Sequence, residues 1–175
     1  QDIAILTGAT VISEEIGMEL EIVDTEFGSI IAGVQSGKYD IGMAGLTVTD
    51  ERKESVNFTS SYATGIQSII VPEGSAIKSL DDLAGKKIGV QQDTTGHIYA
   101  ADEFGDDMVS PFNKGTDAVA ALVAGKVDCV IIDNQPAKSF VEVNEGLAIL
   151  DTDYAVEDYA IAIAKENTEL LEKVN

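Results

Sequence analysis

The sequence contains no tryptophan, three prolines, one histidine and one cysteine among its 175 residues. A single cysteine cannot form an internal disulfide, which excludes the disulfide-stapled class of small domains. Cys129 lies in the apolar run Val127–Ile132, where we expect a small buried thiol. The one histidine, His97, is accompanied by neither paired cysteines nor clustered carboxylates at ligand spacing, so no metal site is expected.

Other chemical signatures are missing as well. The sequence has no glycine-rich phosphate loop, no nucleophile elbow and no nucleophile–base pair, so we expect no cofactor and no catalytic residues. No apolar run approaches the roughly 18 residues that a membrane-spanning helix requires.

Basic residues are few: 11 Lys and Arg stand against 31 Asp and Glu, which gives a net charge of −20. A polyanion is bound by neutralising its phosphates with clustered Lys and Arg, so a nucleic-acid partner is excluded. The content of 45% apolar and 24% charged residues is that of an ordinary globular protein, which we expect to be monomeric.

Short β-branched runs alternate with helical patterns, which predicts the α/β class. A capping box at Ser79–Asp82 followed by Gly85, and segments at Thr116–Ala124, His97–Phe104 and after Thr168, indicate helices. The predicted strands are Ile3–Thr7, Glu19–Val23, Asp40–Ala44, Ser68–Val71, Lys87–Val90, Met108–Pro111, Val127–Ile132 and Leu147–Leu150.

An internal repeat suggests two similar units. Gly37–Ile41 reads GKYDI and Gly125–Cys129 reads GKVDC, and each copy follows an apolar helical segment and enters an apolar strand. The offset makes Gly45 equivalent to Asp133, each at the carboxyl end of a strand, where ligands of open α/β sheets bind. Two lobes facing one cleft are therefore predicted.

The expected division places residues 1–65 and 155–175 in a first lobe and residues 66–154 in a second. Each lobe should be a mainly parallel sheet flanked by helices. Two extended hinge crossovers, Tyr62–Gln67 and Asp151–Tyr159, would join the lobes.

Several segments closely resemble the amino-acid-binding proteins that serve ABC importers, which have a two-lobed periplasmic-binding-protein-like fold. The resemblance covers Glu14–Asn175. It is carried by Gly37–Asp40 (GKYD), Ala44–Arg52 (AGLTVTDER), Val56–Thr59 (VNFT), Tyr62, Leu80–Gln91 (LDDLAGKKIGVQ), Thr94–Gly96 and Asp133–Asn134.

The resemblance implies a periplasmic or extracellular solute-binding protein, either free or lipid-anchored, that captures a polar amino acid between two lobes and delivers it to a membrane permease. It implies that Arg52 receives the substrate carboxylate and that Asp133 receives the ammonium group. Further ligand contacts are expected from Gly45, Leu46, Thr47, Phe27, Gln92, Thr94 and Thr95.

All of these residues except Gln92 have an ordinary structural alternative. Arg52 could pair with Asp50 or Glu51, and Asp133 could cap the helix that starts at Asn134. Gly45–Thr47 could be a plain turn, the two threonines could be only helix caps, and Phe27 could pack in a core. Gln91, Gln92, Asp93 and Glu157 weakly favour a polar or cationic ligand side chain.

Two rival functions stay open. A lyase of the cyclohexadienyl or arogenate dehydratase kind resembles these binding proteins along the whole chain, and it would need a general acid or base such as Glu157 or Asp158. A ligand-binding sensor domain of a receptor is the other rival. One departure from the family also stands out: the aromatic-rich loop and helix start that follow the first strand in the family have no counterpart between Thr10 and Val11.

Overall fold

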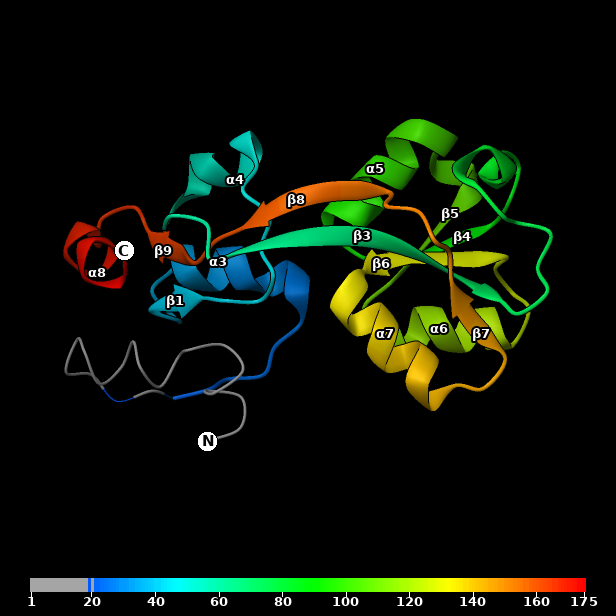
Figure 1. Ribbon diagram of the computed structural model, residues 1–175. Helices are drawn as coiled ribbons and strands as arrows, with labels where there is room; N and C mark the ends of the chain where they lie inside the picture. The colour runs from blue at the N-terminus through cyan, green and yellow to red at the C-terminus, as the bar shows by residue number, and fades with distance from the viewer. Residues whose placement is uncertain (1–18, 20) are drawn as a thin grey trace. The chain divides into compact units, whose positions relative to one another are not determined.

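The computed structural model describes residues 19 and 21–175, and it divides into two compact units (Figure 1). Among the described residues, unit 1 holds 19, 21–25, Ser29–Ser60 and Ala160–Asn175, and unit 2 holds Glu26–Gly28 and Ser61–Tyr159. The chain thus changes units after Ser60 and after Tyr159, whereas the sequence placed these changes at 65 and 155. The predicted strand Ile3–Thr7 and the Thr10–Val11 junction lie outside the described residues.

Unit 1 is built around a three-stranded sheet of order β1-β9-β2, in which β9 runs antiparallel to both neighbours. Ile163 and Ile161 form its centre with Leu170. Its elements are η1 (Phe27–Ser29, which begins in unit 2), α3 (Ile30–Gln35), β1 (Ile41–Gly42), α4 (Asp50–Ser55), β2 (Val56–Phe58), β9 (Ala162–Ala164) and α8 (Thr168–Val174).

The strand predicted over Glu19–Val23 is wrong for its described residues, which are irregular. Ile22 and Val23 are 59% and 52% exposed, so their apolar side chains are not buried against a sheet or helix of the described residues. A β-branched run forms a strand only where a neighbouring strand satisfies its backbone groups.

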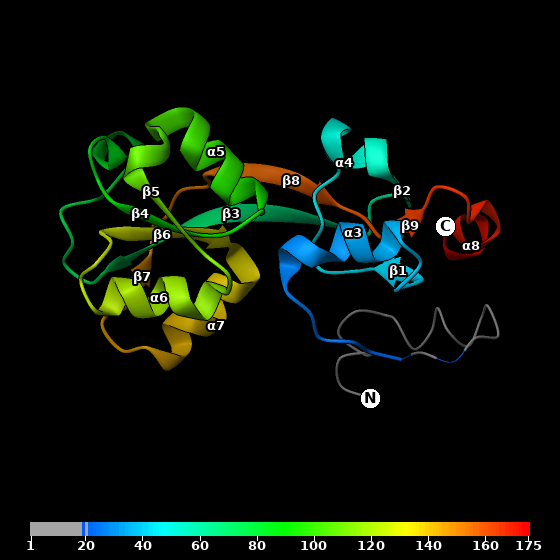
Figure 2. The same cartoon turned by 180° about the vertical axis from the view of Figure 1, so that it is seen from behind.

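Unit 2 contains a six-stranded sheet of order β5-β4-β6-β3-β7, with β8 also paired to β3. Helix α5 covers one face, and α6 and α7 cover the other, as both views show (Figures 1 and 2). The elements are β3 (Ala63–Pro72), η2 (Leu80–Leu83), β4 (Ile88–Gln91), α5 (Thr95–Phe104), η3 (Asp106–Met108), β5 (Val109–Phe112), α6 (Gly115–Val123), β6 (Cys129–Asp133), α7 (Asn134–Val143), β7 (Leu147–Ile149) and β8 (Ala155–Tyr159).

Alternating residues of the central strands fill two separate cores in unit 2. Ile69 and Ile131 pack in the core that includes Ala100 of α5. Ile70 and Val130 point to the opposite face and pack in the core with residues of α6 and α7. Both faces of the sheet are therefore covered, which explains why these strands are continuous apolar runs in the sequence.

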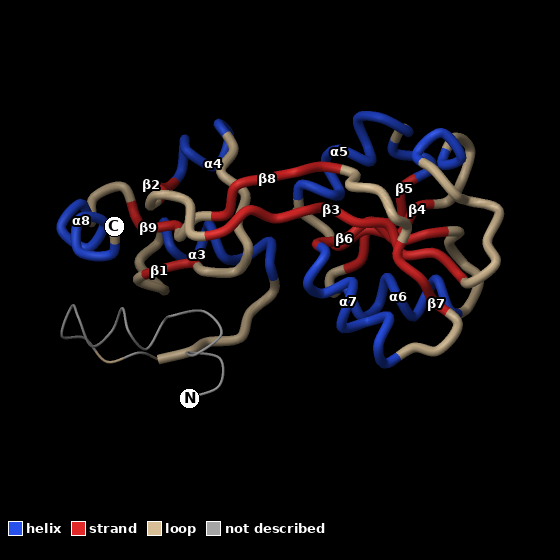
Figure 3. The backbone as a smooth tube through the Cα atoms, viewed as in Figure 1, coloured by secondary structure: helices blue, strands red, loops and turns tan. Residues whose placement is uncertain are grey.

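The predicted α/β class and two-lobed fold are confirmed, but the strand directions need a correction. In unit 2, β4 pairs in parallel with β5 and β6, whereas β3 pairs antiparallel with β6, β7 and β8. The segments expected to be hinges, Tyr62–Gln67 and Asp151–Tyr159, contain the paired residues of β3 and β8, which run side by side (Figure 3). A returning segment beside an outgoing one is antiparallel and needs no crossover helix.

The repeated Gly-Lys segments form the same turn in the two units. The N–H of Gly37 bonds to the carbonyl of Val34 at 3.1 Å, and the N–H of Lys38 bonds to that of Gly33 at 2.9 Å. At the second copy, the N–H groups of Gly125 and Lys126 bond to the carbonyls of Leu122 and Ala121, both at 2.9 Å. Gly37 and Gly125 have φ of 74° and 66°. Each copy is thus a Schellman helix end, the turn that glycine in the left-handed region favours.

The capping box predicted at Ser79–Asp82 is present. Asp82 accepts the backbone N–H groups of Lys78 and Ser79 at 2.9 and 3.0 Å, and these bonds hold the pKa of its carboxyl group below the usual value. Within the described residues, no helix is both long and apolar enough to cross a membrane.

Candidate functional site

In unit 1, the loop after β1 brings four of the predicted ligand residues together. Gly45 has φ of 60°, and its left-handed backbone turns the chain toward Leu46 and Thr47, which are both buried. The carbonyl of Leu46 accepts the N–H of Ala160 at 3.1 Å, so the loop is tied to the short segment between β8 and β9. The carbonyl of Thr47 accepts Nη1 of Arg52 at 2.9 Å.

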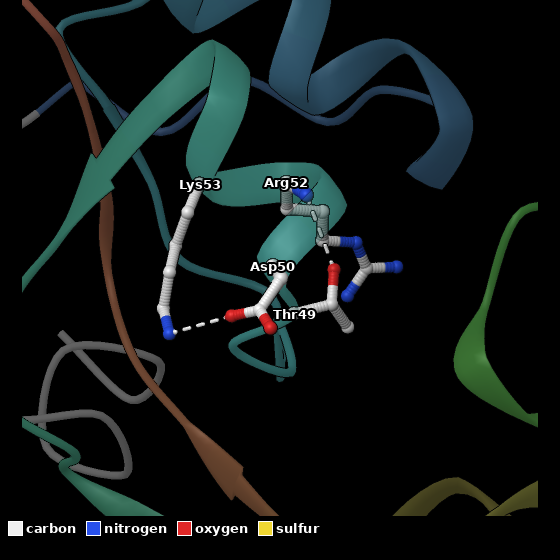
Figure 4. A network of polar contacts seen from close by, with 4 residues as sticks. All are labelled: Thr49, Asp50, Arg52 and Lys53. Atoms are coloured by element: carbon white, nitrogen blue, oxygen red, sulfur yellow. Dashed lines mark hydrogen bonds and ion pairs between the residues drawn. The ribbon is translucent and has the colours of Figure 1, made fainter.

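Arg52 lies in the first turn of α4, whose N-cap is Thr49. The hydroxyl of Thr49 accepts the N–H of Arg52 at 3.2 Å. Lys53 extends to Asp50, forming an ion pair of 3.1 Å, while the guanidinium of Arg52 is turned to the other side (Figure 4). The carbonyl of Thr47 therefore orients a planar fork of donors, and such a fork matches a carboxylate with two parallel hydrogen bonds.

In unit 2, the carboxyl ends of β4 and β6 lie at the same edge of the sheet, because the two strands are parallel. Gln92, Thr94 and Thr95 follow β4, and Asp133 is the last residue of β6. Four predicted ligand residues are thus brought to one edge of one sheet.

Thr94 is the N-cap of α5. Its hydroxyl donates to the carbonyl of Gln91 at 2.8 Å and accepts the N–H of His97 at 3.3 Å. Thr94 is therefore a helix cap, which is the structural alternative that the sequence left open for it. Thr95 is buried in the first turn, where helix N–H groups are available to an anion.

Asp133 is also a cap. Its Oδ1 accepts the N–H of Gln135 at 2.7 Å at the start of α7, and its Oδ2 accepts the hydroxyl of Tyr159. A carboxylate oxygen can accept more than one hydrogen bond, so both oxygens keep capacity for a further donor. The half-buried carboxylate can cap α7 and receive an ammonium group at the same time.

Phe27, the one remaining predicted residue, and Gln92 lie near this edge. Phe27 is half-buried in η1, and its neighbour Gly28 approaches Asp93 so closely that a Cβ at 28 would lie 2.2 Å from Asp93 Oδ2. Gln92 is exposed, and its N–H bonds to the carbonyl of Phe112 at 2.8 Å. Both residues thus belong to the surroundings of the loop that follows β4.

Two residues beside Asp133 were not predicted from the sequence, Gln67 and Tyr159. Gln67 pairs with Asp133 across β3 and β6, and its Nε2 donates to Oε2 of buried Glu157 at 2.9 Å. Oε1 of Gln67 and Oε1 of Glu157 are buried and accept no hydrogen bond from the described residues. Burial, followed by the bond to Asp133, raises the pKa of Tyr159 well above its usual value. A polar residue in an otherwise apolar strand, such as Gln67 before Ser68–Val71, was the available sequence signal.

His97 Nδ1 accepts the N–H of Asp93 at 3.3 Å. Over residues 19 and 21–175, no cluster of three or more His, Cys, Asp or Glu side chains is placed to hold a metal ion.

The fold and the polar residues at its strand ends define a class, the two-lobed α/β proteins of the periplasmic-binding-protein type. The family described as bacterial extracellular solute-binding proteins, family 3, matches residues 7–175, and the chain belongs to that family.

Named relatives agree with this assignment. The arginine-binding extracellular protein ArtP of Bacillus subtilis is 31% identical over 95% of this chain and 67% of its own length. The arginine-bound form of a truncated ArgBP from T. maritima has a TM-score of 0.89 and 38% identity, covering 95% of this chain and 79% of that one. The arginine-, lysine-, histidine-binding protein ArtJ of Geobacillus stearothermophilus gives a TM-score of 0.89 at 34% identity, with 97% and 75% covered. The chain thus spans about two thirds of the length of the curated relative ArtP.

Proposed function

We propose that this chain captures a free amino acid outside the cytoplasmic membrane and delivers it to the permease of an ABC importer. The observation that carries the proposal is the placement of Asp133 beside the N-terminus of α5 at the edge formed by β4 and β6. This placement occurs in a chain of the extracellular solute-binding family. The relatives are binding proteins for amino acids, which favours a binding protein over the lyase considered from the sequence.

The proposal gives each end of the amino acid a partner of opposite charge. Arg52 receives the carboxylate, with its guanidinium oriented by the carbonyl of Thr47. Asp133 receives the ammonium group through the remaining acceptor capacity of its two oxygens. Gly45, Leu46 and Thr47 in unit 1 and Thr94 and Thr95 in unit 2 contribute backbone and hydroxyl groups.

We further propose that the bound amino acid has a cationic side chain, with arginine as the first candidate. ArtP, ArgBP and ArtJ all carry arginine in their names. The net charge of −20 attracts a cation at long range.

Isothermal titration calorimetry with the natural amino acids tests the function directly. The expected result is one saturable ligand, or a small set of cationic ones, with arginine the tightest. The absence of binding by every amino acid would overturn the proposal. An assay of product release from a carboxylated cyclohexadienyl ring tests the lyase in parallel, and catalytic turnover would establish the rival.

Two truncated ligands test the assigned roles. Agmatine is arginine without its carboxylate, and the desamino analogue of arginine lacks the ammonium group. Arg52→Ala should bring the affinity for arginine down toward that for agmatine, while Asp133→Ala should bring it down toward that of the desamino analogue. If each variant still discriminates against its own truncated ligand as the parent does, the assigned roles are wrong.

Delivery to a permease also distinguishes an importer subunit from a receptor sensor domain. An importer subunit should stimulate arginine uptake by vesicles that contain its cognate permease and ATPase. The expected result is that uptake increases only when the chain and arginine are both present. Separately, size-exclusion chromatography with light scattering should give the mass of a monomer.

A further inference from the structure

The hydroxyl of Tyr159 reaches Asp133 across a central strand of the unit 2 sheet. Tyr159 pairs with Ala63 on one side of β3, and Asp133 pairs with Gln67 on the other side. Residues 63, 65 and 67 of β3 point to the same face, because side chains alternate along a strand. Gly65 therefore lies between the two partners on the face that they share.

Gly65 has no side chain, and this leaves room for the Tyr159 side chain to cross β3 toward Asp133. A Cβ at position 65 would lie 1.9 Å from Cζ and 2.2 Å from Oη of Tyr159. No side-chain atom tolerates such a distance, so the ring occupies the space above the glycine. Only glycine at 65 leaves room for the Tyr159 ring in the position from which its hydroxyl reaches Asp133.

The contact fixes the orientation of the Asp133 carboxylate. Oδ2 accepts the Tyr159 hydroxyl, and Oδ1 accepts the N–H of Gln135 at 2.7 Å. With one donor on each oxygen, rotation of the carboxylate about its last bond would break both hydrogen bonds. Orienting a binding group before the ligand arrives removes an entropy cost from association.

The neighbouring groups on this face also constrain the hydroxyl. Glu157 points to the same face as Tyr159 and is held by Nε2 of Gln67 at 2.9 Å. Tyr159 is 6% exposed, and a buried hydroxyl requires a hydrogen-bond partner. Asp133 provides that partner, so ring position and carboxylate orientation depend on each other.

We propose that Tyr159 is a positioning residue that holds Asp133 in the orientation that receives the ammonium group of the ligand. The inference rests on the proposed function. Tyr159 itself does not contact the ligand, and it acts through Asp133. A purely structural tie between β8 and β6 is the competing explanation, and it predicts a loss of stability without a specific loss of affinity.

Tyr154 provides a matched control. It is also a partly buried tyrosine of unit 2, and its hydroxyl donates to a carboxylate, Oε2 of Glu103, at 2.8 Å. Tyr154→Phe therefore removes the same kind of hydrogen bond without affecting Asp133. Tyr159→Phe keeps the ring over Gly65 and removes only the hydroxyl.

The test is a double-mutant cycle, measured by calorimetry with the tightest amino acid from the panel. Tyr159→Phe should weaken binding roughly ten-fold, as expected for a bond to a charged group, whereas Tyr154→Phe should change it by less than about two-fold. In an Asp133→Ala background, Tyr159→Phe should have no further effect, because its target is absent. A merely structural role would lower the unfolding temperature of Tyr159→Phe and leave its affinity close to that of Tyr154→Phe.

The outcomes separate this inference from the proposed function. A parent protein that binds no amino acid overturns both. A parent that binds, with Tyr159→Phe as tight as Tyr154→Phe, overturns only the positioning role. Circular dichroism melts of each variant without ligand show whether it is folded, and Tyr159→Leu serves as a second variant that also removes the hydroxyl.

Discussion

The ring of Tyr159 lies directly over Gly65, in the space that any side chain at position 65 would occupy. A Cβ there would be 1.9 Å from the ring carbon Cζ. Gly65 and Glu157 pair across β3 and β8, so the neighbouring backbone is held by the sheet and cannot retreat. The packing of this edge of unit 2 therefore depends on one residue having no side chain.

Gly65→Ala should destabilise the protein by about 1 to 3 kcal/mol, the usual range for an overpacked site. The measurement is the free energy of unfolding in urea, without ligand. In a Tyr159→Ala background the same substitution should cost much less, because the ring has been removed. An equal cost in the two backgrounds would show that the contact with Tyr159 is not the cause.

Arg52→Ala and Asp133→Ala should each weaken amino-acid binding by about 2 to 5 kcal/mol, because each leaves one ligand charge without its partner. Lys53→Ala is the matched control for the arginine. Lys53 is the next residue on α4 and its ion pair with Asp50 is exposed. Its removal should change affinity by no more than about 0.5 kcal/mol.

The affinities are measured by calorimetry and the unfolding temperatures by circular dichroism. Without ligand, the unfolding temperature of Arg52→Ala should stay close to that of the parent. Asp133→Ala should lower the unfolding temperature, because it removes the cap of α7 and the partner of the Tyr159 hydroxyl. Parental affinity in both variants would contradict the assigned site.

The paired turns at Gly37 and Gly125 make a prediction about the internal repeat. Gly37→Ala and Gly125→Ala should each cost about 1 to 2 kcal/mol, because a Cβ is unfavourable in the left-handed region. No atom lies within 4 Å of a Cβ added at either position, so the cost is conformational rather than a clash. Asn at the same positions should cost less, since Asn tolerates this conformation.

Urea unfolding of all four variants provides the measurement. If Ala and Asn are equally destabilising, the left-handed backbone is not the reason. If alanine lowers the free energy of unfolding at only one of the two positions, the two turns share a geometry but do not contribute equally to stability.

Local sequence signals predicted most of unit 2. Leu147–Leu150 was predicted and β7 is Leu147–Ile149, and β4 and β5 each begin one residue later than predicted. These strands are short β-branched runs bounded by glycines and helix caps, so periodicity and turn chemistry identify them. The helix predicted over Thr116–Ala124 is α6 (Gly115–Val123), and it ends at the turn of Gly125.

Strand direction and register could not be predicted from such local sequence signals. β8 was interpreted only as a hinge, since Glu157 and Asp158 interrupt its apolar pattern. Its pairing with β3 places Tyr159 near Asp133, and that contact depends on register across three strands rather than on neighbours in the chain. Arg52 could be chosen from its motif, but the carbonyl of Thr47 that orients it became visible only in the folded loop.

Cys129 gives the last prediction, which concerns pH. The thiol is fully buried, and burial together with the charge of Asp128 raises its pKa to about 12. In the unfolded chain a cysteine ionises near about 8.5. The folded pKa is thus the higher one, so the thiol's contribution to stability is complete below about pH 8.5. It is lost progressively as the pH rises toward 12, because only the unfolded state then gains by ionising.

The free energy of unfolding of the parent should therefore fall faster with alkaline pH than that of Cys129→Ala, by up to about 1.4 kcal/mol per pH unit. Other titrating groups are common to both proteins, so the difference between them isolates the thiol. Urea unfolding between pH 7 and 10.5 measures this difference, and parallel curves for the two proteins would contradict the prediction. A thiol reagent at pH 8 gives a second test: the native protein should resist it for as long as it stays folded, since a buried neutral thiol offers no thiolate to react.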